Sequence, residues 1–416
     1  MRPMKSHKLL FAVLCGFVFA SFSAPARAQT FQVLHSFQGW DGASPVAPVI
    51  LDNRGNIYGT TIAGGATSVR GASRCTSEGC GTVFVMNEAG REIALHSFEG
   101  ADGAYPFAGI LRDSRGNLFG TTSQGGRTPR ACNRQGCGVA FRFSAEGKKI
   151  EYDFQGAPDG SDPQPSVVED SAGNLYGTTF YGGKNGLGTV FKIDMATGKE
   201  TVLYSFTGGT DGCYPYGVIL DSAGNLYGVA YEGGNALCDS GDGLVFELDS
   251  AGNETVLYTF GGADGANPSS VLMFDSAGDL YGTTQGGGSS DWGTVFELSP
   301  GQGGRWSERV LHSFCSLPEC ADGVVASGGP LVMDGSGNIY GTTSLGGQDG
   351  DQGVAFKLDP AGNETVLHSF TGGSDGGSPY AGLAIDSLGN LYGTTYTGGT
   401  PCYVIYTCGV VFKITP

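Results

Sequence analysis

Short segments of alternating apolar and polar residues, rich in Val, Thr, Tyr and Phe, follow one another along the chain after residue 28. Such segments are typical of β-strands, and turns containing Gly, Asp and Asn separate them. The phrase Gly-Asn-Leu-Tyr-Gly-Thr-Thr recurs with small changes, and its aromatic residue returns every 51 to 61 residues. The seven aromatic positions are Tyr58, Phe119, Tyr176, Tyr227, Tyr281, Tyr340 and Tyr392. No helical periodicity accompanies these repeats, so the pattern predicts an all-β protein.

Each repeat unit contains four predicted strands, which we name A to D in chain order. Residues 217–220 are an example of A, 225–228 of B, 188–192 of C and 200–206 of D. Turns of the type Asp-Ser-Ala-Gly-Asn join A to B. A four-stranded unit of about 55 residues, present seven times, is the pattern of a β-propeller, whereas the rungs of a β-helix are much shorter.

The order of strands at the two chain ends predicts how the ring closes. The repeats open with a lone D segment at residues 31–37 and end with A, B and C of the seventh unit, up to residue 414. A ring pairs the spare D strand with the seventh unit, whereas a solenoid leaves two strand edges open. We therefore predict a seven-bladed β-propeller of four-stranded blades, closed by the N-terminal strand joining the C-terminal blade.

The repeated phrases resemble a known bacterial family. Leu-Tyr-Gly-Thr-Thr, Gly-Thr-Val-Phe-Lys and Val-Leu-His-Ser-Phe look like the choice-of-anchor GloVer tandem repeat, and the resemblance covers essentially all of residues 31–415. The resemblance implies an exported repeat protein, often with a C-terminal surface anchor, and it brings no known activity. This chain departs from that pattern because it ends at Pro416 without an anchor segment.

Residues 1–28 have the pattern of a secretory signal peptide. Three basic residues precede an apolar run at residues 9–22, and Ala-Arg-Ala at residues 26–28 offers a cleavage site. We expect residues 29–416 to form a single propeller domain that is exported, either secreted or periplasmic, and monomeric. No later segment has the ~18 successive apolar residues of a membrane span.

The charge and composition exclude several classes of protein. The formal net charge is −17, which disfavours nucleic acid as a partner because phosphates attract Lys and Arg. Glycine contributes 74 residues but does not fall at every third position, so collagen is excluded. Hydrophobic residues make up 40% of the chain, which is enough for a packed core.

The cysteines predict disulfides. Eleven are present and ten follow the predicted signal, and an even number in an exported chain favours bridges. Four pairs are close in sequence, and the two remaining cysteines lie in neighbouring loops of one predicted face. The predicted bridges are Cys75–Cys80, Cys132–Cys137, Cys213–Cys238, Cys315–Cys320 and Cys402–Cys408. A zinc site is the alternative, but its ligands would come from separate blades.

Histidine and aspartate recur at fixed places of the unit. Histidines in D segments stand where other units have tyrosine, which indicates packing, and each D–A loop contains Asp-Gly, which is typical of a turn. The histidines are His35, His96, His312 and His368, and the aspartates are Asp41, Asp102, Asp159, Asp211, Asp264, Asp322 and Asp375. The pattern singles out no catalytic carboxylate pair, and we expect no metal and no cofactor.

The B–C loops differ in charge among the units, and function on a repeat scaffold is expected where the copies differ. The candidate ligand-binding residues are Arg70, Arg74, Arg127, Arg130 and Arg134 in the first two units, with Trp40 and Trp292 in loops of the same predicted face. Arginines bind carboxylate, sulfate or phosphate groups, and tryptophans stack on sugars. Scattered solubilising charge is the competing interpretation of the arginines.

These observations favour a non-enzymatic binding or scaffold propeller. Its expected ligand is an extracellular protein or an acidic polysaccharide. The alternative is a glycan hydrolase or lyase that uses loop-face aspartates.

Overall fold

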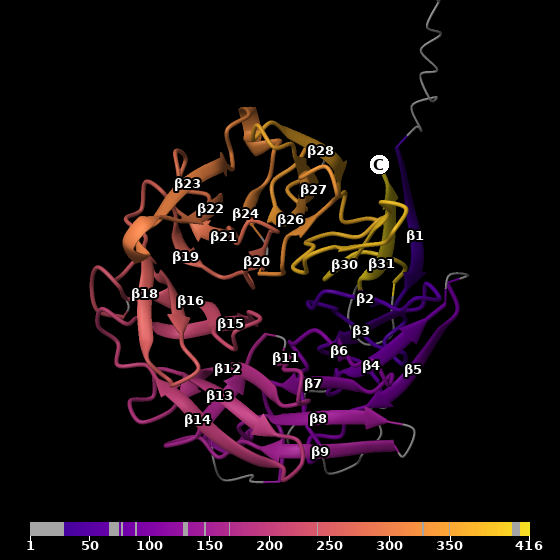
Figure 1. Ribbon diagram of the computed structural model, residues 1–416. Helices are drawn as coiled ribbons and strands as arrows, with labels where there is room; N and C mark the ends of the chain where they lie inside the picture. Colours follow the sequence, from indigo (N-terminus) through magenta and orange to yellow (C-terminus); the bar gives the residue numbers. More distant parts are fainter. Residues whose placement is uncertain are drawn as a thin grey trace, which may run out of the picture.

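The computed structural model describes residues 29–65, 75, 78–87, 90–127, 132–144, 147–165, 167–238, 240–326, 328–348, 350–401 and 408–416. Within these residues the protein is a ring of seven antiparallel sheets that follow one another around a central axis in chain order (Figure 1). This architecture confirms the predicted seven-bladed β-propeller. The described ranges contain no α-helix, and no helix in them is long and apolar enough to cross a membrane.

The first four blades are built from consecutive strands. Blade 1 consists of β2 (Ile50–Leu51), β3 (Ile57–Thr61), β4 (Thr82–Met86) and β5 (Glu92–Ser97). Blade 2 consists of β6 (Leu111–Arg112), β7 (Leu118–Thr122), β8 (Val139–Ser144) and β9 (Gly147–Asp153). Blade 3 consists of β10 (Gly160–Pro163), β11 (Val168–Glu169), β12 (Leu175–Gly182), β13 (Thr189–Asp194) and β14 (Lys199–Ser205). Blade 4 consists of β15 (Cys213–Leu220), β16 (Leu226–Glu232), β17 (Leu244–Leu248) and β18 (Glu254–Thr259).

The remaining blades include the closing strand. Blade 5 consists of β19 (Ala266–Pro268), β20 (Met273–Phe274), β21 (Leu280–Gly286), β22 (Thr294–Pro300) and β23 (Trp306–Ser313). Blade 6 consists of β24 (Val324–Ala326), β25 (Val332–Met333), β26 (Ile339–Leu345), β27 (Val354–Leu358) and β28 (Glu364–Ser369). Blade 7 consists of β29 (Ala384–Ile385), β30 (Leu391–Thr395), β31 (Val410–Thr415) and β1 (Thr30–Ser36). Short 3-10 turns are η1 (Cys132–Arg134), η2 (Gln302–Gly304) and η3 (Pro318–Cys320).

The N-terminal strand closes the ring as predicted. Strand β1 runs antiparallel to β31, with Phe31 opposite Ile414 and Ser36 opposite Val410, so it is the outer strand of blade 7. One difference from the predicted unit concerns strand A. In blades 3, 5 and 6 it is interrupted, and both halves pair with strand B of the same blade.

Phenylalanines that pack edge-on or tilted against one another hold neighbouring blades together. A Phe at the end of each D strand packs against the Phe of the next blade's C strand, with ring centroids 5.1–5.3 Å apart. Phe206 and Phe246 are one such pair, and both are fully buried. This packing explains the glycine of Leu-Tyr-Gly-Thr-Thr. A Cβ added to Gly228 would lie 2.7 Å from Cζ of Phe246, so only glycine fits.

Candidate functional site

A pocket of about 360 Å³ lies on the propeller axis. Every one of the seven units contributes a residue to its wall, which only a position on the axis allows. The lining residues are Val46, Ile62, Phe107, Gln164, Tyr216, Gln285, Gly328, Tyr380 and Tyr396. Each follows a D–A loop or lies at or just after the last residues of a B strand, so the pocket lies at the end of the channel that faces the D–A and B–C loops. We call it the channel mouth.

The channel mouth combines aromatic rings with amide groups. Phe107 is 38% exposed and Tyr380 is 42% exposed, whereas most large aromatic residues of the described ranges are buried or half-buried. Tyr380 packs edge-on against Tyr396, with ring centroids 5.5 Å apart. Exposed ring faces stack on apolar faces of ligands, and amides supply donors and acceptors without charge. This wall is suited to an uncharged polar ligand with apolar faces.

An unusual backbone conformation directs the first ring of lining residues. The second residue after each Asp-Gly has a positive φ, although none of the seven is glycine, with values from 49° to 58°. These residues are Ser44, Tyr105, Asp162, Tyr214, Asn267, Val325 and Ser378. Two positions further on lie the mouth residues Phe107, Gln164, Tyr216 and Tyr380. A left-handed backbone conformation costs free energy in a residue other than glycine. Its presence in all seven units shows that the fold requires this backbone conformation at the mouth.

A second ring of variable residues follows the Thr-Thr of strand B. Gln285 and Tyr396 line the mouth, and Tyr231 donates a hydrogen bond of 3.2 Å to Oε1 of Gln285. Phe180, at the same position of the third unit, stacks on Tyr214 with ring centroids 5.0 Å apart. The mouth therefore continues outward into an aromatic surface over blades 3 and 4.

A second depression of about 400 Å³ adjoins the mouth between blades 2 and 3. Its wall includes Gln135 from the B–C loop of the second unit, together with Asp162 and Tyr181. Gln164 of the mouth donates a 2.9 Å hydrogen bond to Oδ1 of Asp162, so this pair connects the two depressions. Burial raises the pKa of Asp162, and burial together with the charge of Asp162 raises the pKa of Tyr216 to about 12.

The predicted arginine patch lies partly within the described residues. Arg127 and Arg134 are exposed, and Arg134 immediately precedes Gln135 of the second depression. The predicted contacts Arg70, Arg74 and Arg130 lie outside the described residues. The patch therefore stays a prediction.

The two tryptophans are exposed but belong to separate parts of the loop face. Trp40 lies in the loop that leads from β1 into blade 1, and Trp292 lies between β21 and β22 of blade 5. The structure does not bring them together, and neither lines the mouth. Their proposed stacking on a sugar stays a prediction.

Four of the five predicted disulfides lie within the described residues and are confirmed. They are Cys75–Cys80, Cys132–Cys137, Cys213–Cys238 and Cys315–Cys320. The Cys213–Cys238 bridge joins a D–A loop to the B–C loop that follows it, as predicted for the two cysteines that have no close neighbour in sequence. Cys408 is also disulfide-bonded, and its predicted partner Cys402 lies outside the described residues.

The aspartates of the Asp-Gly loops are turn residues. In all seven units the carboxylate accepts a backbone N–H from its own loop, at 2.7–3.1 Å. In six units it also accepts a hydrogen bond from the His or Tyr of the preceding D strand. Histidine Nε2 and tyrosine Oη reach the same carboxylate, which explains why the two residues alternate at this position. The predicted turn and packing roles are confirmed.

A glutamate from the next blade completes this contact at five of the seven interfaces. The glutamates are Glu92, Glu200, Glu254, Glu308 and Glu364, each within the first three residues of a D strand. Burial, with the charge of the neighbouring aspartate, raises the pKa of the first four to about 7 and that of Glu364 to about 8. In each, Oε1 is buried without a hydrogen-bond partner.

Two of these interfaces contain a histidine and could hold a metal ion. The groups are His35 with Asp41 and Glu92, and His312 with Asp322 and Glu364. In each group the ligand atoms lie within 4.8 Å of one another.

Comparison with known proteins agrees with the repeats and the ring. The profile of the Gloeobacter/Verrucomicrobia repeat matches residues 16–131, 70–276, 128–328 and 238–416, which together cover most of the chain. The chain belongs to this repeat family. A search of curated proteins gave no match.

Solved structures similar to this member of the repeat family share its fold at low identity. Virginiamycin B lyase from Staphylococcus aureus is 11% identical with a TM-score of 0.58, over 93% of this chain and 99% of that chain. The extracellular domain of a protein described as a one-component system from B. thetaiotaomicron is 10% identical with a TM-score of 0.56. That match covers 90% of this chain and 39% of the other. At such identities the likeness establishes the propeller fold alone.

Sequence reasoning missed the channel mouth and the inter-blade glutamates. The mouth residues follow the repeated Asp-Gly and Thr-Thr phrases at fixed distances. Their variation among the units, beside such constant phrases, could have indicated a binding site. The glutamates open the repeated phrase Glu-Thr-Val-Leu-Tyr-Ser-Phe, but their partners belong to the preceding unit. Only the ring geometry brings the two together.

Proposed function

We propose that this protein is an exported, non-enzymatic binding propeller that holds a polysaccharide at the channel mouth. The observation that carries the proposal is the wall of the mouth, where the exposed rings of Phe107 and Tyr380 and the amides of glutamine residues line one pocket. A pyranose ring has an apolar face for stacking and hydroxyl groups for amides, which is the chemistry that such a wall recognises.

The internal comparison of the repeats supports the mouth as the binding site. The repeat positions that build the blades keep the same residue type, such as the Phe at the end of each D strand and the Asp of each D–A loop. The equivalent mouth positions hold Val46, Phe107, Gln164, Tyr216 and Tyr380. Residues that do not hold the blades together differ from unit to unit. A ligand without sevenfold symmetry needs a binding site whose residues differ in this way.

Export is supported by the disulfides and by the signal pattern. Disulfides persist in oxidising compartments and are rare in the cytosol. The four described bridges therefore favour a periplasmic or secreted protein, as does the signal pattern of residues 1–28. Surface attachment in the manner of choice-of-anchor proteins is part of the same proposal.

The geometry of the D–A loops favours binding over hydrolysis. A glycosidase needs two carboxyl groups free to face a substrate, with pKa values separated by their environments. The Asp-Gly carboxylates instead accept loop N–H groups and contact D-strand side chains between the blades. These groups are committed to holding turns.

The test is a glycan screen followed by calorimetry on the mature, disulfide-bonded protein. For the best polysaccharide of the screen, Tyr380→Ala and Gln164→Ala should each weaken binding ~10-fold, which corresponds to about 1.4 kcal/mol. The matched control is Leu388→Ala, an exposed apolar residue in the A–B turn at the other end of the channel. Equal affinity of Tyr380→Ala and Leu388→Ala would place the ligand elsewhere.

A further inference from the structure

The interface between blades 5 and 6 brings three metal-ligating side chains together. His312 comes from β23, Asp322 from the loop that leads into blade 6, and Glu364 from β28. Nε2 of His312 lies 3.5 Å from Oδ2 of Asp322 and 4.0 Å from Oε2 of Glu364. The three side chains are 11%, 0% and 7% exposed, so all three are largely withdrawn from water.

This interface differs from the other six in its hydrogen bonding. Elsewhere the His or Tyr of the D strand donates to the aspartate, as His368 does to Asp375 at 3.1 Å. Nε2 of His312 has no hydrogen-bond partner, because 3.5 Å exceeds hydrogen-bond length. Oε1 of Glu364 is also buried without a partner. Nε2 of His312 and Oε1 of Glu364 therefore make no hydrogen bond, and His312 contacts the two carboxylates only at 3.5 and 4.0 Å.

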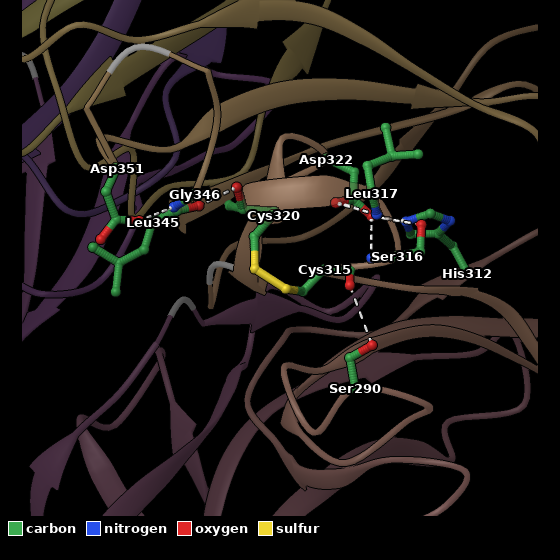
Figure 2. Close-up of a disulfide and its surroundings, with 11 residues drawn as sticks. Ser290, His312, Cys315, Ser316, Leu317, Cys320, Asp322, Leu345, Gly346 and Asp351 are labelled. Carbon is green, nitrogen blue, oxygen red and sulfur yellow. Dashed lines mark hydrogen bonds and ion pairs between the residues drawn. A yellow bond between two sulfur atoms is a disulfide. The ribbon is translucent and has the colours of Figure 1, made fainter.

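The loop that carries Asp322 explains the difference. Seven residues separate Phe314 from Asp322, against three or four in the other units. The longer loop is closed by the Cys315–Cys320 bridge (Figure 2). It places Ser316 so that both its N–H, at 2.8 Å, and its hydroxyl, at 2.7 Å, donate to Oδ2 of Asp322. The carboxylate is thereby oriented by its loop, while Nε2 of His312 stays 3.5 Å from it, at ion-pair distance (Figure 2).

We propose that His312, Asp322 and Glu364 bind a divalent transition-metal ion of the zinc class, which joins the outer strands of blades 5 and 6. An imidazole nitrogen and two carboxylates are ligands that zinc accepts, and a cation supplies the counter-charge for two buried carboxylates. At zinc–ligand distances of about 2.0–2.2 Å, tetrahedral ligand atoms stand about 3.3–3.6 Å apart. The observed separations of 3.5 and 4.0 Å require only a small contraction.

The hydrogen bonds around Asp322 fit a ligand role. Ligating carboxylates are usually held by outer hydrogen bonds, and the Ser316 donors provide them here. The partial exposure of His312 leaves a side from which water could complete the coordination. Because the ligands come from two blades, the bound ion would oppose separation of the blades.

The other interfaces provide matched controls inside the same molecule. Tyr258 occupies the place of His312 one interface earlier and bonds Asp264, but it offers no imidazole nitrogen. His368 has an aspartate partner, yet Phe31 stacks on its ring at 3.7 Å where other interfaces have glutamate. The substitutions His312→Tyr and His368→Tyr therefore install a residue that the chain itself tolerates at this position.

The experiment measures zinc bound to the mature protein by equilibrium dialysis against Zn²⁺ after chelator treatment, with thermal melts in parallel. We expect His312→Tyr and Glu364→Gln each to remove one bound ion, or to weaken it at least 10-fold. His368→Tyr should bind as wild type does. Zinc should raise the melting temperature of wild type and of His368→Tyr more than that of His312→Tyr.

Failure of wild type to retain zinc, or retention of the same number of ions by His312→Tyr, would overturn the proposal. Equal loss in His312→Tyr and His368→Tyr would also overturn it, because only the former has a glutamate in its group. The glycan measurements above do not depend on this ion, so the two proposals fail separately.

Discussion

The contacts between blades and the channel mouth are built by the same seven units, yet they use the repetition in opposite ways. Between blades, each unit supplies the same Phe pair and the same aspartate turn. At the mouth, equivalent positions hold valine, phenylalanine, glutamine or tyrosine. Positions that make contacts needed by every blade keep the same residue type in all units. Positions that face only the axis differ from unit to unit. The sevenfold framework thus presents an asymmetric surface.

The largest effect should come from the phenylalanine pairs between blades. Phe246→Ala empties a fully buried position against Phe206 and should lower the free energy of unfolding by about 3–5 kcal/mol. Tyr380→Ala at the mouth should change it by less than about 0.5 kcal/mol. Urea denaturation of the two variants checks this contrast. Comparable destabilisation by both would show that the mouth belongs to the framework.

The aspartate turns should give the next largest effect. Asp211→Ala removes the acceptor for the Thr207 N–H, at 2.7 Å, and for the Tyr204 hydroxyl, at 3.0 Å. Leaving these donors unpaired should cost about 1–3 kcal/mol in the same assay. Tyr204→Phe is the control, because it removes one donor and leaves the turn intact. A loss in Asp211→Ala no larger than in Tyr204→Phe would contradict the turn role.

The inter-blade glutamates predict that stability falls as pH rises. The pKa of Glu200 is raised from 4.5 to about 7 by burial and by the charge of Asp159, and Tyr152 also faces this pair. The folded state therefore holds the proton more tightly than the unfolded state between about pH 4.5 and 7, and this stabilisation is lost as pH rises through 7. The melting temperature of wild type should be lower at pH 8 than at pH 5.

Glu200→Gln sharpens this prediction. The amide stays neutral, so the fall in melting temperature between pH 5 and pH 8 should be smaller than in wild type. Glu99→Gln, at an exposed position, is the control and should follow the wild-type curve. Identical pH profiles of all three proteins would show that Glu200 does not titrate in this window.

The smallest effect is expected from the arginine patch. Arg127→Ser with Arg134→Ser should leave stability and neutral-glycan binding unchanged. It should weaken binding of an acidic polysaccharide by less than about 1 kcal/mol for each arginine, because both side chains are exposed. Wild-type affinity for that polymer should decrease as salt rises. Unchanged affinity of the double variant at low salt would identify the arginines as solvated surface charge.

The seven-bladed ring could be predicted because the features that specify it are local in sequence. Seven copies of one strand pattern, with a spare D segment before Pro45, determine the number of blades and the closure by β1. Cysteine spacings likewise predicted the described bridges. These features depend on neighbours in sequence or on the count of units.

The candidate sites could not be predicted because they depend on backbone geometry and ring assembly. Tyr214 and Asp162 have a left-handed backbone conformation, which sequence analysis expects at glycine. Two residues after each of them, Tyr216 and Gln164 line the channel mouth. Glu364 meets His312 only after two blades pack side by side. Histidines interpreted as packing residues therefore include two, His35 and His312, that belong to groups with the geometry of a metal site.

A crystal structure of the mature protein with the best polysaccharide from the screen tests the central claim most directly. We predict a saccharide on the propeller axis, stacked on Tyr380 and hydrogen-bonded to Gln164. A saccharide bound at the outer rim of the blades, or at the A–B turn end of the channel, would contradict the assignment of the channel mouth as the binding site.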